Sequence, residues 1–469
     1  MNQGNYHPIV HRFAVILSGA TLLLIFVVNA FASRQPLIKP VFVANVTETT
    51  ALGYVNSPKF FFDRDGFAYF SATSQGPNFT PAIELFRSRE KWPNIKSFDR
   101  FFLENTDTLS VSSTLHFSQS ICLGSNQTVY IVWAGGKTFS QSDPGIAHQI
   151  RNAAVEFGGG LKLGKEEQPF VVTGFSDVYD VPYTNEQFWQ ERPSVAKTID
   201  GILHVVWEAR DKNRLADDGT PYPAIAYAWR DPSGKWSVSG PIDRPPYLSA
   251  QGISEAQFDP LILTNGTDPI HVLCTGDVDE RNQILYGQIR GGKFSGWKMV
   301  AYSPYDQGQV TAVLDSEGNL HVAWREGEVN GRVFISHCEM KKNGTWSSPD
   351  IIGLDYTLDS TPSIAIDGSK ITIAWISWEP GFINSDGEED NNFPEDDDTV
   401  EGRLFIATKQ IGANNFTDPK ELIGGICSYP NLGVEDVTSK GRTAIIWASG
   451  QECVPKDCVQ LFFGTLPKK

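Results

Sequence analysis

The sequence predicts an all-β protein, a β-propeller of seven blades with four antiparallel strands in each blade. One observation is a short pattern, a Gly-containing turn followed by an alternating apolar strand that ends in an aromatic residue, which recurs along the chain. Another is that each copy is flanked by further short apolar runs, as strands separated by turns require. The composition agrees, because 42 Gly, 28 Pro and 12 Trp against 3 Met are typical of a turn-rich β protein.

The recurring strand is clearest in three copies, which run from Asp200 to Trp207, from Gly318 to Trp324 and from Asp367 to Trp375. Looser copies bring the number of strand-ending anchor positions to seven, between 50 and 74 residues apart. These anchors are Phe70, Trp133, Trp207, Cys274, Trp324, Trp375 and Trp447. We expect them to occupy equivalent positions in successive sheets, where an aromatic side chain would pack between neighbouring blades.

The remaining strands of each repeat lie before the turn and after the anchor residue. A Gly-x-Trp motif often precedes the fourth strand, as at Gly234 and Gly344. Four strands in a repeat of this length match a propeller blade. The copy around Trp133 has the least clear third and fourth strands, so six blades is the alternative. The chain ends at a third-strand position, so residues 40–50 are expected to supply the missing outer strand and close the ring.

We expect the chain to consist of a signal peptide or signal anchor at residues 1–32, an N-terminal segment at residues 33–50 and the propeller at residues 51–469. An apolar run begins at Phe13 after Arg12, and Ala30-Phe31-Ala32 has the form of a signal-peptidase site. The alternative is an uncleaved signal anchor, because residues 13–32 are long enough to span a bilayer. Both interpretations predict an extracytoplasmic protein, secreted or cell-surface, whose only membrane contact is an uncleaved N-terminal segment.

The net charge, the cysteines and the sequons indicate which partners and which compartment the protein has. Lys plus Arg number 39 and Asp plus Glu 55, a net charge of −16, which argues against a broad basic surface for nucleic acid. Cys453 and Cys458 are close enough to form a disulfide in an oxidising compartment, with Cys427 as an alternative partner. Six N-x-S/T sequons predict a glycoprotein, although turn chemistry explains two of them, Asn265 and Asn343, equally well. The six acceptors are Asn45, Asn78, Asn126, Asn265, Asn343 and Asn415.

Two motifs carry a resemblance to a known family. Gly-x-Trp precedes the fourth strand, and Pro193-Ser-Val-Ala leads into a turn and His204-Val-x-Trp207. Together they resemble the sialidase-like propellers with Asp-box (BNR) repeats, over about residues 50–469. The box normally reads Ser-x-Asp-x-Gly-x-Thr-Trp, whereas here Gly344-Thr-Trp keeps its end and Asp231 stands three places before Gly234. The resemblance implies a site at one face of the central channel, formed by the starts of the innermost strands and the ends of the second strands.

That face, which we call the mouth, is expected to carry charged and aromatic residues from most blades. At the starts of innermost strands they are His116, Arg192, Asp259, Asp306, Asp359 and Tyr429, and at the ends of second strands Glu208, Arg210, Asp277, Arg325, Glu326, Trp378 and Glu379. Repetition at equivalent places distinguishes this set from ordinary charged loop residues.

Three kinds of chemistry fit these residues. The resemblance implies sialidase-type hydrolysis, in which Arg192, Arg210 and Arg325 would clamp a substrate carboxylate, but the family's Arg-Ile-Pro signature is missing. In another carbohydrate enzyme, Asp259 or Asp306 with Glu208 or Glu326 would act as acid and base, or His116 beside Arg192 would serve a lyase. In a binding module, tryptophans near the mouth would stack on sugar faces, for example Trp133, Trp207, Trp324 and Trp378, although a Trp that recurs in every blade is most simply a packing residue.

The sequence therefore predicts an extracytoplasmic, sialidase-like propeller that recognises carbohydrate or glycoprotein; whether it also hydrolyses glycosidic bonds is not decided by the sequence. The alternative is a non-catalytic secreted or membrane-anchored scaffold for protein partners. No metal site and no cofactor are predicted, with calcium at the acidic run from Asp386 to Glu401 as the alternative. Three histidines, His204, His271 and His321, recur at one structural position, where packing or a hydrogen bond is favoured over metal ligation.

Overall fold

Every element in the described part of the chain is a β-strand, and the strands form seven separate antiparallel sheets. The computed structural model describes residues 38–46, 52, 59–75, 81–102, 114–124, 127–137, 149–157, 162–163, 191–215, 221–242, 253–327, 333–353, 358–378, 402–423, 427–435, 442–449 and 459–466. Within these ranges no helix has the length and apolarity needed to cross a membrane. The signal peptide or anchor predicted at residues 1–32 lies outside them.

The seven sheets are numbered blade 1 to blade 7 in chain order. Each of the first three blades contains four consecutive strands. Blade 1 contains β2 (Phe60–Phe62), β3 (Ala68–Gln75), β4 (Pro81–Ser88) and β5 (Phe98–Phe102). Blade 2 contains β6 (Thr114–Leu123), β7 (Thr128–Lys137), β8 (Gln149–Glu156) and β9 (Lys162–Leu163). Blade 3 contains β10 (Glu191–Lys197), β11 (Leu203–Leu215), β12 (Pro221–Arg230) and β13 (Trp236–Pro241).

The later blades follow the same order, with an additional short strand in blade 4. Blade 4 contains β14 (Ile253–Leu263), β15 (Ile270–Val278), β16 (Arg281–Arg290), β17 (Lys293–Phe294) and β18 (Lys298–Met299). Blade 5 contains β19 (Gln307–Leu314), β20 (Leu320–Glu326), β21 (Phe334–Met340) and β22 (Asp350–Ile352). Blade 6 contains β23 (Leu358–Asp367), β24 (Lys370–Trp378), β25 (Arg403–Gln410) and β26 (Lys420–Ile423). Blade 7 contains β27 (Cys427–Glu435), β28 (Arg442–Ser449), β29 (Val459–Thr465) and β1 (Val41–Val46).

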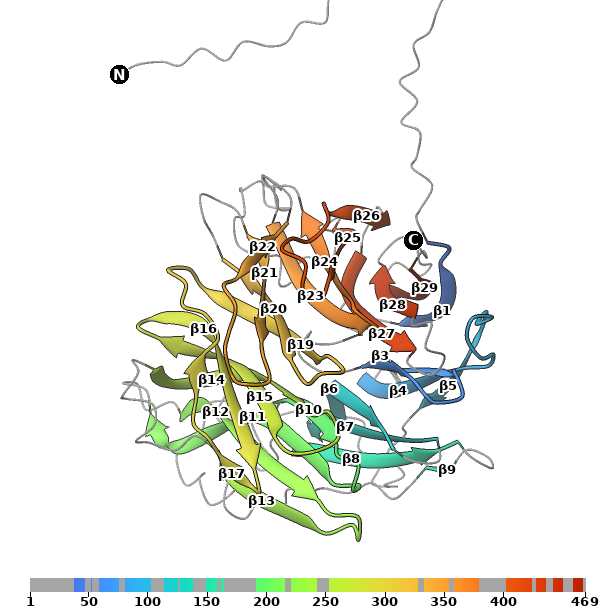
Figure 1. Cartoon of the computed structure of the whole chain (residues 1–469). Coiled ribbons are helices and arrows are strands. Elements are labelled where there is room, and N and C mark those ends of the chain that lie inside the picture. The colour runs from blue at the N-terminus through green and yellow to red at the C-terminus, as the bar shows by residue number, and fades with distance from the viewer. Residues whose placement is uncertain are drawn as a thin grey trace, which may run out of the picture. The chain divides into compact units, whose positions relative to one another are not determined.

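The seven sheets are arranged as a closed ring with the first strand of each blade innermost. The first strands of consecutive blades contact one another in chain order from β2 to β27, and β27 also contacts β2. Figure 1 shows the same order in colour, with the last sheet in red beside the first in blue. The protein is therefore a seven-bladed β-propeller, and the fold class predicted from the sequence is confirmed.

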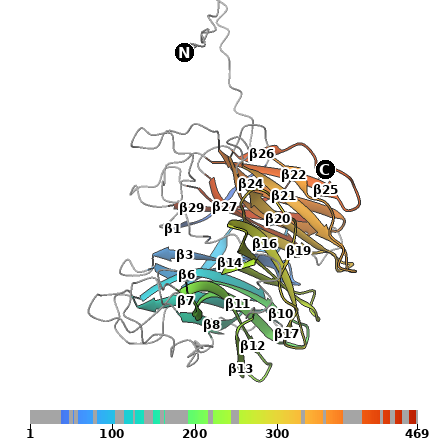
Figure 2. The same cartoon turned by 90° about the vertical axis from the view of Figure 1, so that its left-hand side faces the viewer.

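The ring is closed by the N-terminal segment. Strand β1 pairs antiparallel with β29, from Val41 opposite Phe463 to Val46 opposite Val459, and the two strands lie side by side in both orientations (Figure 1, Figure 2). Blade 7 thus takes three strands from the C-terminal part of the chain and its outer strand from residues 41–46. Pairing of this kind covers the edge of β29, which would otherwise present unpaired backbone groups.

The seven anchor residues occupy equivalent positions in the seven blades. All seven lie on the second strand of their blade, and every one is at most 3% exposed. In six blades the anchor stands opposite an irregularity in the innermost strand, as Trp207 does between the pairs Glu191–Glu208 and Ser194–Val206. The inference that these residues are equivalent is therefore correct, and their main role is to fill the space between blades.

Serine side chains connect neighbouring blades near these anchor positions. The hydroxyl of Ser120 accepts a hydrogen bond from the backbone nitrogen of Val195 at 3.1 Å. Ser194 accepts from Ile262 at 3.1 Å, and Ser363 accepts from Leu432 at 2.9 Å. Each of these serines is buried and lies one residue beyond the irregularity of its innermost strand. The serine after the bulge therefore connects adjacent innermost strands, and in two of these three cases it belongs to a Pro-Ser-x-Ala segment, at Ser194 and Ser363.

Candidate functional site

Six innermost strands carry a two-residue bulge close to the mouth. Each bulge leaves two residues opposite a single anchor on the second strand. In β14 the bulge lies past the middle of the strand, because this strand begins at Ile253 and the bulge is at Asp259–Pro260. The residue pairs are Ser118–Gln119, Arg192–Pro193, Asp259–Pro260, Gln309–Val310, Thr361–Pro362 and Tyr429–Pro430. A bulge redirects a side chain out of the regular alternation, and bulges are concentrated beside functional sites.

Four consecutive blades place the first bulge residue in the left-handed region of backbone space. The φ angles are 52° for Arg192, 55° for Asp259, 51° for Gln309 and 49° for Thr361. Residues with a side chain rarely adopt such angles, at a cost of about 1 kcal/mol or more each. The strained backbone conformation recurs at the same position in four blades, so the surrounding structure must stabilise it there. As a result, four polar side chains project from equivalent positions of the ring.

Two of these residues form the core of an ion cluster between blades 3 and 4. The Nη1 atom of Arg192 lies 2.6 Å from Oδ1 of Asp259 and 3.4 Å from Oε2 of Glu208. The side chains are 23%, 15% and 10% exposed, respectively, so the cluster is largely desolvated but still reached by solvent. We call these three residues the mouth cluster. The sequence predicted all three as site residues, and the structure brings them together.

The arrangement defines what the mouth cluster can do chemically. Both carboxylates contact one nitrogen, which puts them within about 6 Å of each other, near the separation of paired carboxylates in glycoside hydrolases. Carboxylate oxygens that retain solvent access can accept hydrogen bonds from ligand hydroxyl groups. The guanidinium holds both acceptors in place, because its planar set of N–H donors fixes the direction of each bond.

A second link between bulges joins blades 5 and 6. The Oε1 atom of Gln309 accepts hydrogen bonds from the hydroxyl of Ser360 and the backbone nitrogen of Thr361, both at 2.8 Å. Between blades 1 and 2, the hydroxyl of Thr73 donates to Oε1 of Gln119 at 2.9 Å. Bulge side chains therefore cross blade boundaries at three places, and only the crossing from Arg192 to Asp259 is ionic among these described contacts.

The other two predicted acid–base candidates are engaged in holding a loop. Glu326 accepts hydrogen bonds from the hydroxyls of Ser303 and Ser336, both at 2.5 Å, and from Nε1 of Trp324 at 3.3 Å. Asp306 accepts from the backbone nitrogen of Asn282 at 2.9 Å. These contacts give Glu326 and Asp306 an evident structural role beside the mouth.

Except for Glu379, the remaining predicted site residues lie on the innermost and second strands of several blades. Arg325 is half-buried opposite Gly308, Asp359 is fully buried opposite Ser377, and Asp277 is half-buried on β15. The side chains of four residues lie outside the described part although their strands are described, namely His116, Arg210, Trp378 and Tyr429. Glu379 lies outside it entirely. The predicted roles of all these residues remain predictions.

Three residues at this end of the ring were missed by sequence reasoning. Gln309 and Thr361 belong to the bulges. Pro362 is a signal for the bulge at Thr361, because proline inside a strand is confined to edges and bulges, whereas Gln309 is followed by Val310 and carries no such signal. The third is Lys59, which directly precedes β2 and is 1% exposed. Burial lowers the pKa of Lys59 to about 7. No pattern in the sequence distinguishes this lysine from a surface one.

The predicted modification sites divide between described and undescribed residues. The four described sequon residues, Asn45, Asn265, Asn343 and Asn415, are all exposed. Asn78 and Asn126 lie outside the described residues, as do Cys453, Cys458 and the acidic run for which calcium was the alternative. In the part of the chain that is described, Cys122, Cys274 and Cys338 are free thiols.

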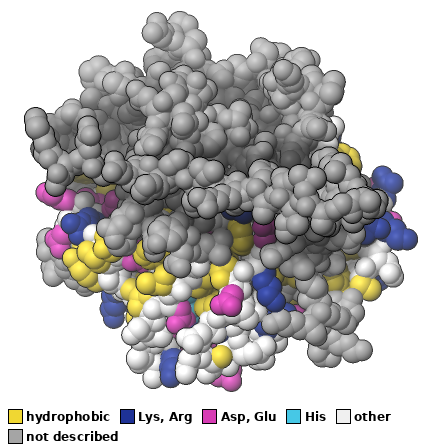
Figure 3. Space-filling model, turned by 90° about the horizontal axis from the view of Figure 1, so that it is seen from above, with side chains coloured by type: hydrophobic (Ala, Val, Ile, Leu, Met, Phe, Trp, Pro, Cys, Tyr) yellow, Lys and Arg dark blue, Asp and Glu magenta, His cyan; other side chains and the backbone are white. Residues whose placement is uncertain are grey.

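The described surface carries both signs of charge. In the face drawn in Figure 3, the coloured Lys and Arg side chains are interspersed with Asp, Glu and apolar ones. They do not gather by sign on that part of the face. This distribution gives no support to a broad basic interface there.

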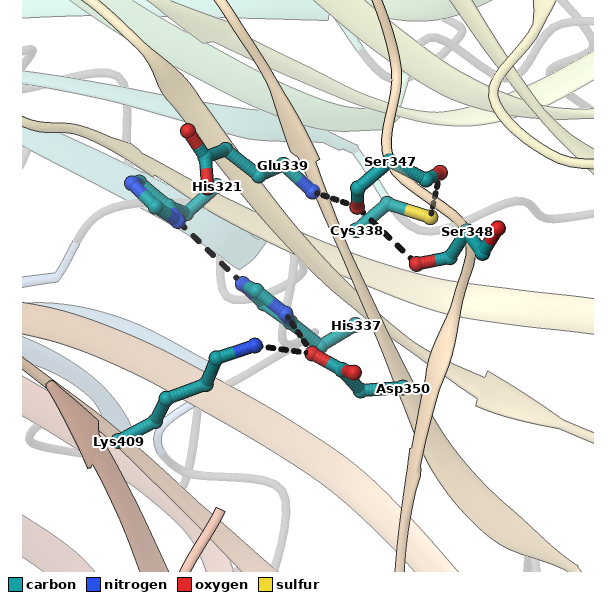
Figure 4. A network of polar contacts seen from close by, with 8 residues as sticks. All are labelled: His321, His337, Cys338, Glu339, Ser347, Ser348, Asp350 and Lys409. Atoms are coloured by element: carbon teal, nitrogen blue, oxygen red, sulfur yellow. Dashed lines mark hydrogen bonds and ion pairs between the residues drawn. The ribbon is translucent and has the colours of Figure 1, made fainter. Parts of the chain in front are cut away.

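A different polar network lies within blades 5 and 6 (Figure 4). Nδ1 of His321 lies 3.4 Å from Nε2 of His337, whose Nδ1 lies 3.3 Å from Oδ2 of Asp350. The same Asp350 oxygen accepts from Nζ of Lys409 at 2.5 Å, across the blade boundary. We call these four residues the histidine network. Both imidazoles are at most 1% exposed, and burial lowers the pKa of His321 and of His337.

The equivalent histidines of blades 3 and 4 have simpler partners. Nδ1 of His204 pairs with the hydroxyl of Tyr227 at 2.8 Å, and Nδ1 of His271 with that of Tyr286 at 2.9 Å. These hydrogen bonds lie within one blade. Among the described residues, no group of three or more His, Cys, Asp or Glu side chains has the geometry to hold a metal ion.

Comparison with known proteins identifies the fold. No protein-family model matches the sequence, and no curated protein matches it. Among solved structures, an ulvan lyase from a new family of polysaccharide lyases is similar with a TM-score of 0.54 and 12% identity over 90% of this chain and 95% of that chain. An ulvan lyase of this family bound to GlcA(1-4)Rha3S is similar with a TM-score of 0.54 and 11% identity, covering 90% and 95% of the two chains. The endosialidase of phage phi92 has a TM-score of 0.49 and 9% identity over 92% of this chain and 70% of that chain. At such identities the likeness shows the fold alone.

Proposed function

We propose that this chain is a carbohydrate-recognising β-propeller whose ligand binds at the mouth, over the cluster of Arg192, Asp259 and Glu208. The observation that carries the proposal is the position of this cluster on two strained bulges of adjacent innermost strands. Polar groups that are fixed before the ligand arrives lose little conformational freedom on binding. A mouth of this kind suits a ligand with many hydroxyl groups in defined directions.

The geometry favours one role for Arg192 over another. A clamp for a substrate carboxylate needs a guanidinium whose donors are available to the ligand, whereas Nη1 of Arg192 already contacts two protein carboxylates. Replacing such contacts exposes the carboxylates to an uncompensated desolvation cost. Arg192 is therefore proposed to position Asp259 and Glu208 rather than to bind a sialic acid or uronate directly.

Glycosidic bond hydrolysis is the reaction that this pair would support. Two carboxylates at this separation can divide the roles of acid and nucleophile or base. We assign Asp259 and Glu208 to these roles in preference to Asp306 and Glu326, because the latter two hold backbone and hydroxyl groups of the neighbouring loop. The polysaccharide lyase named above has a similar fold, which supports carbohydrate as the ligand class; it is a precedent neither for hydrolysis nor for these residues.

We also propose that the protein works outside the cytosol. The apolar run at residues 13–28, the small-x-small site at Ala30 to Ala32 and the six sequons support this location. Exposure of all four described sequon residues keeps them accessible to a glycosyltransferase. Secretion after cleavage and retention by an uncleaved anchor are distinguished by the N-terminal sequence of the mature protein.

The experiment that tests the proposed function is a binding and turnover screen on the purified protein. Binding is measured on an array of neutral, uronate-containing and sialylated oligosaccharides, and turnover with fluorogenic glycosides and polysaccharides. We expect saturable binding to at least one glycan class, and hydrolysis that is lost in Glu208→Gln and Asp259→Asn but kept in Asp65→Asn. Asp65 is exposed in a turn at the opposite end of the strands, so it controls for charge removal alone.

Absence of binding and turnover across the whole panel would contradict the proposal. It would favour the alternative, a non-catalytic scaffold for protein partners, which makes no use of the mouth cluster. Binding without turnover would keep carbohydrate recognition and overturn the assignment of Asp259 and Glu208 as a hydrolytic pair.

A further inference from the structure

Residues 300–306, which we call the mouth loop, connect the outer strand β18 of blade 4 to the innermost strand β19 of blade 5. The loop arrives at the mouth, because Gln307 begins β19 and pairs with Glu326, the last residue of β20. It also lies over the start of β16, where Asn282 donates to Asp306. The loop therefore passes from the rim of the ring toward its centre on the proposed ligand-binding face.

The mouth loop is held from beneath by buried polar side chains. Nε2 of Gln283, which is 1% exposed, donates to the carbonyl oxygens of Ser303 and Tyr305 at 3.2 and 3.0 Å, and its Oε1 accepts from the nitrogen of Ser303 at 2.9 Å. Gln307 is 3% exposed and bonds the backbone of Ile284 at 2.9 Å. A loop whose backbone groups are paired in this way has one preferred conformation.

Further contacts fix the loop from the two neighbouring strands. Nη1 of Arg281 donates to the carbonyl of Pro304 at 2.6 Å, and the hydroxyl of Ser303 donates to Glu326 at 2.5 Å. The nitrogen of Gly327 donates to the carbonyl of Asp306 at 2.6 Å. Blade 4 and blade 5 thus both hold the loop, and the support includes Glu326, one of the predicted acid–base residues.

On this rigid loop one large aromatic side chain faces solvent. Tyr302 is 66% exposed, whereas the next residue, Ser303, is 3% exposed. Tyrosine presents a broad apolar face with a polar tip and loses few rotamers when it binds, which makes it effective at interfaces. Backbone contacts determine where the Tyr302 ring can reach, although the ring itself packs little against the protein.

We propose that Tyr302 is a sugar-stacking residue of the mouth, on which the apolar face of a pyranose ring lies. The C–H groups on one face of a pyranose carry partial positive charge and are attracted to the negative face of an aromatic ring. The mouth loop supplies the pre-organised support that such a contact needs to gain affinity. The support under the loop gives Glu326 a positioning role, with Tyr302 as the residue that touches the ligand.

This proposal rests on the proposed function, because it names one contact of the same carbohydrate site. The test measures affinity for the oligosaccharide bound most tightly in the panel described above, by titration calorimetry. We expect Tyr302→Ala to weaken binding about tenfold, as truncation of a central tyrosine at an interface commonly does. Tyr302→Trp should retain the affinity, and its fluorescence emission should shift when the oligosaccharide is added.

The control is Ile351→Ala, which removes an equally exposed apolar side chain from the outer strand β22, where Ile351 is 70% exposed. It should bind like the wild type. Equal affinities for Tyr302→Ala and the wild type, with unchanged melting temperatures, would overturn the role of Tyr302 while the proposed function stands. A wild-type protein that binds no member of the panel would overturn both.

Discussion

Two polar clusters in this propeller contain similar residues but sit in different surroundings. The mouth cluster lies on strained bulges between blades 3 and 4, and each of its side chains keeps at least 10% exposure. The histidine network lies on the unbroken register of β20, β21 and β22, with both imidazoles at most 1% exposed. Both clusters also cross a blade boundary, from Arg192 to Asp259 and from Asp350 to Lys409.

The difference teaches how to separate a binding site from internal support in a repeat protein. Charge alone does not separate the two clusters, since each pairs a carboxylate with a cationic side chain, Arg192 in one and Lys409 in the other. Backbone irregularity does, because a fold keeps strained residues only where the surrounding structure fixes them. Solvent access separates only the imidazoles, since Asp350 and Lys409 are 29% and 13% exposed. By these criteria the mouth cluster is the candidate for binding, and the histidine network stabilises blades 5 and 6.

The largest expected effect is the loss of stability when buried histidines become protonated. Burial lowers the pKa of His204 to about 4 and that of His271 to about 4, from 6.5. The unfolded chain therefore binds more protons than the folded one between these values, and stability falls as the pH drops through this window. We expect each histidine to cost about 2 kcal/mol at pH 5 relative to pH 7, and the two together about 4 kcal/mol, measured by urea unfolding.

The carboxyl group of Asp315 acts at lower pH than these histidines. Burial raises the pKa of Asp315, but the hydrogen bonds it accepts, above all from Asn319, outweigh burial and lower the pKa below 3.8. The stability that this group contributes is therefore present above pH 3.8 and is lost as the pH falls below that value. His271→Gln cannot titrate and should reduce the slope of stability against pH between 4 and 6.5. Equal stability of the wild type at pH 7 and pH 5 would contradict the expectation.

A smaller effect is expected from neutralising the acceptor of the histidine network. In Asp350→Asn, Lys409 and His337 lose the carboxylate that both contact, and a partly buried ammonium is left without its counterion. We expect the free energy of unfolding to fall by about 2 kcal/mol. The matched variant Asp65→Asn, whose Lys91 partner lies 3.6 Å away in solvent, should lose less than about 0.5 kcal/mol. The histidine network has no supporting role if the two variants unfold alike.

The fold was readable from the sequence, whereas the assembly of the site was not. Buried aromatic anchors such as Trp207, Trp324 and Trp375 recur because every blade boundary must be filled, and this periodicity predicted seven sheets and the closing strand near residue 41. The contact between Arg192 and Asp259 depends instead on the register at two bulges in different blades. Residues 67 positions apart gave no sequence signal that they meet.

The smallest expected effect concerns the strain at the bulges. Thr361 has a φ angle of 49°, and a β-branched residue is poorly suited to it, whereas glycine adopts it freely. Thr361→Gly should therefore leave the free energy of unfolding within about 0.5 kcal/mol of the wild type, because relief of strain offsets the lost side chain. The same change at Thr372, fully buried on the regular strand β24, should cost about 2 kcal/mol. Comparable losses at both positions would argue against strain in the bulge.

The most direct test of the contrast between the two clusters compares Asp259→Asn with Asp350→Asn. Both remove one carboxylate charge, and asparagine tolerates the left-handed backbone of position 259 at least as well as aspartate does. We measure affinity for the tightest-binding oligosaccharide and the free energy of unfolding of both variants. The predicted result is binding at least tenfold weaker with near wild-type stability in Asp259→Asn, and wild-type binding with reduced stability in Asp350→Asn. Wild-type binding by Asp259→Asn would contradict the assignment of the ligand to the mouth cluster.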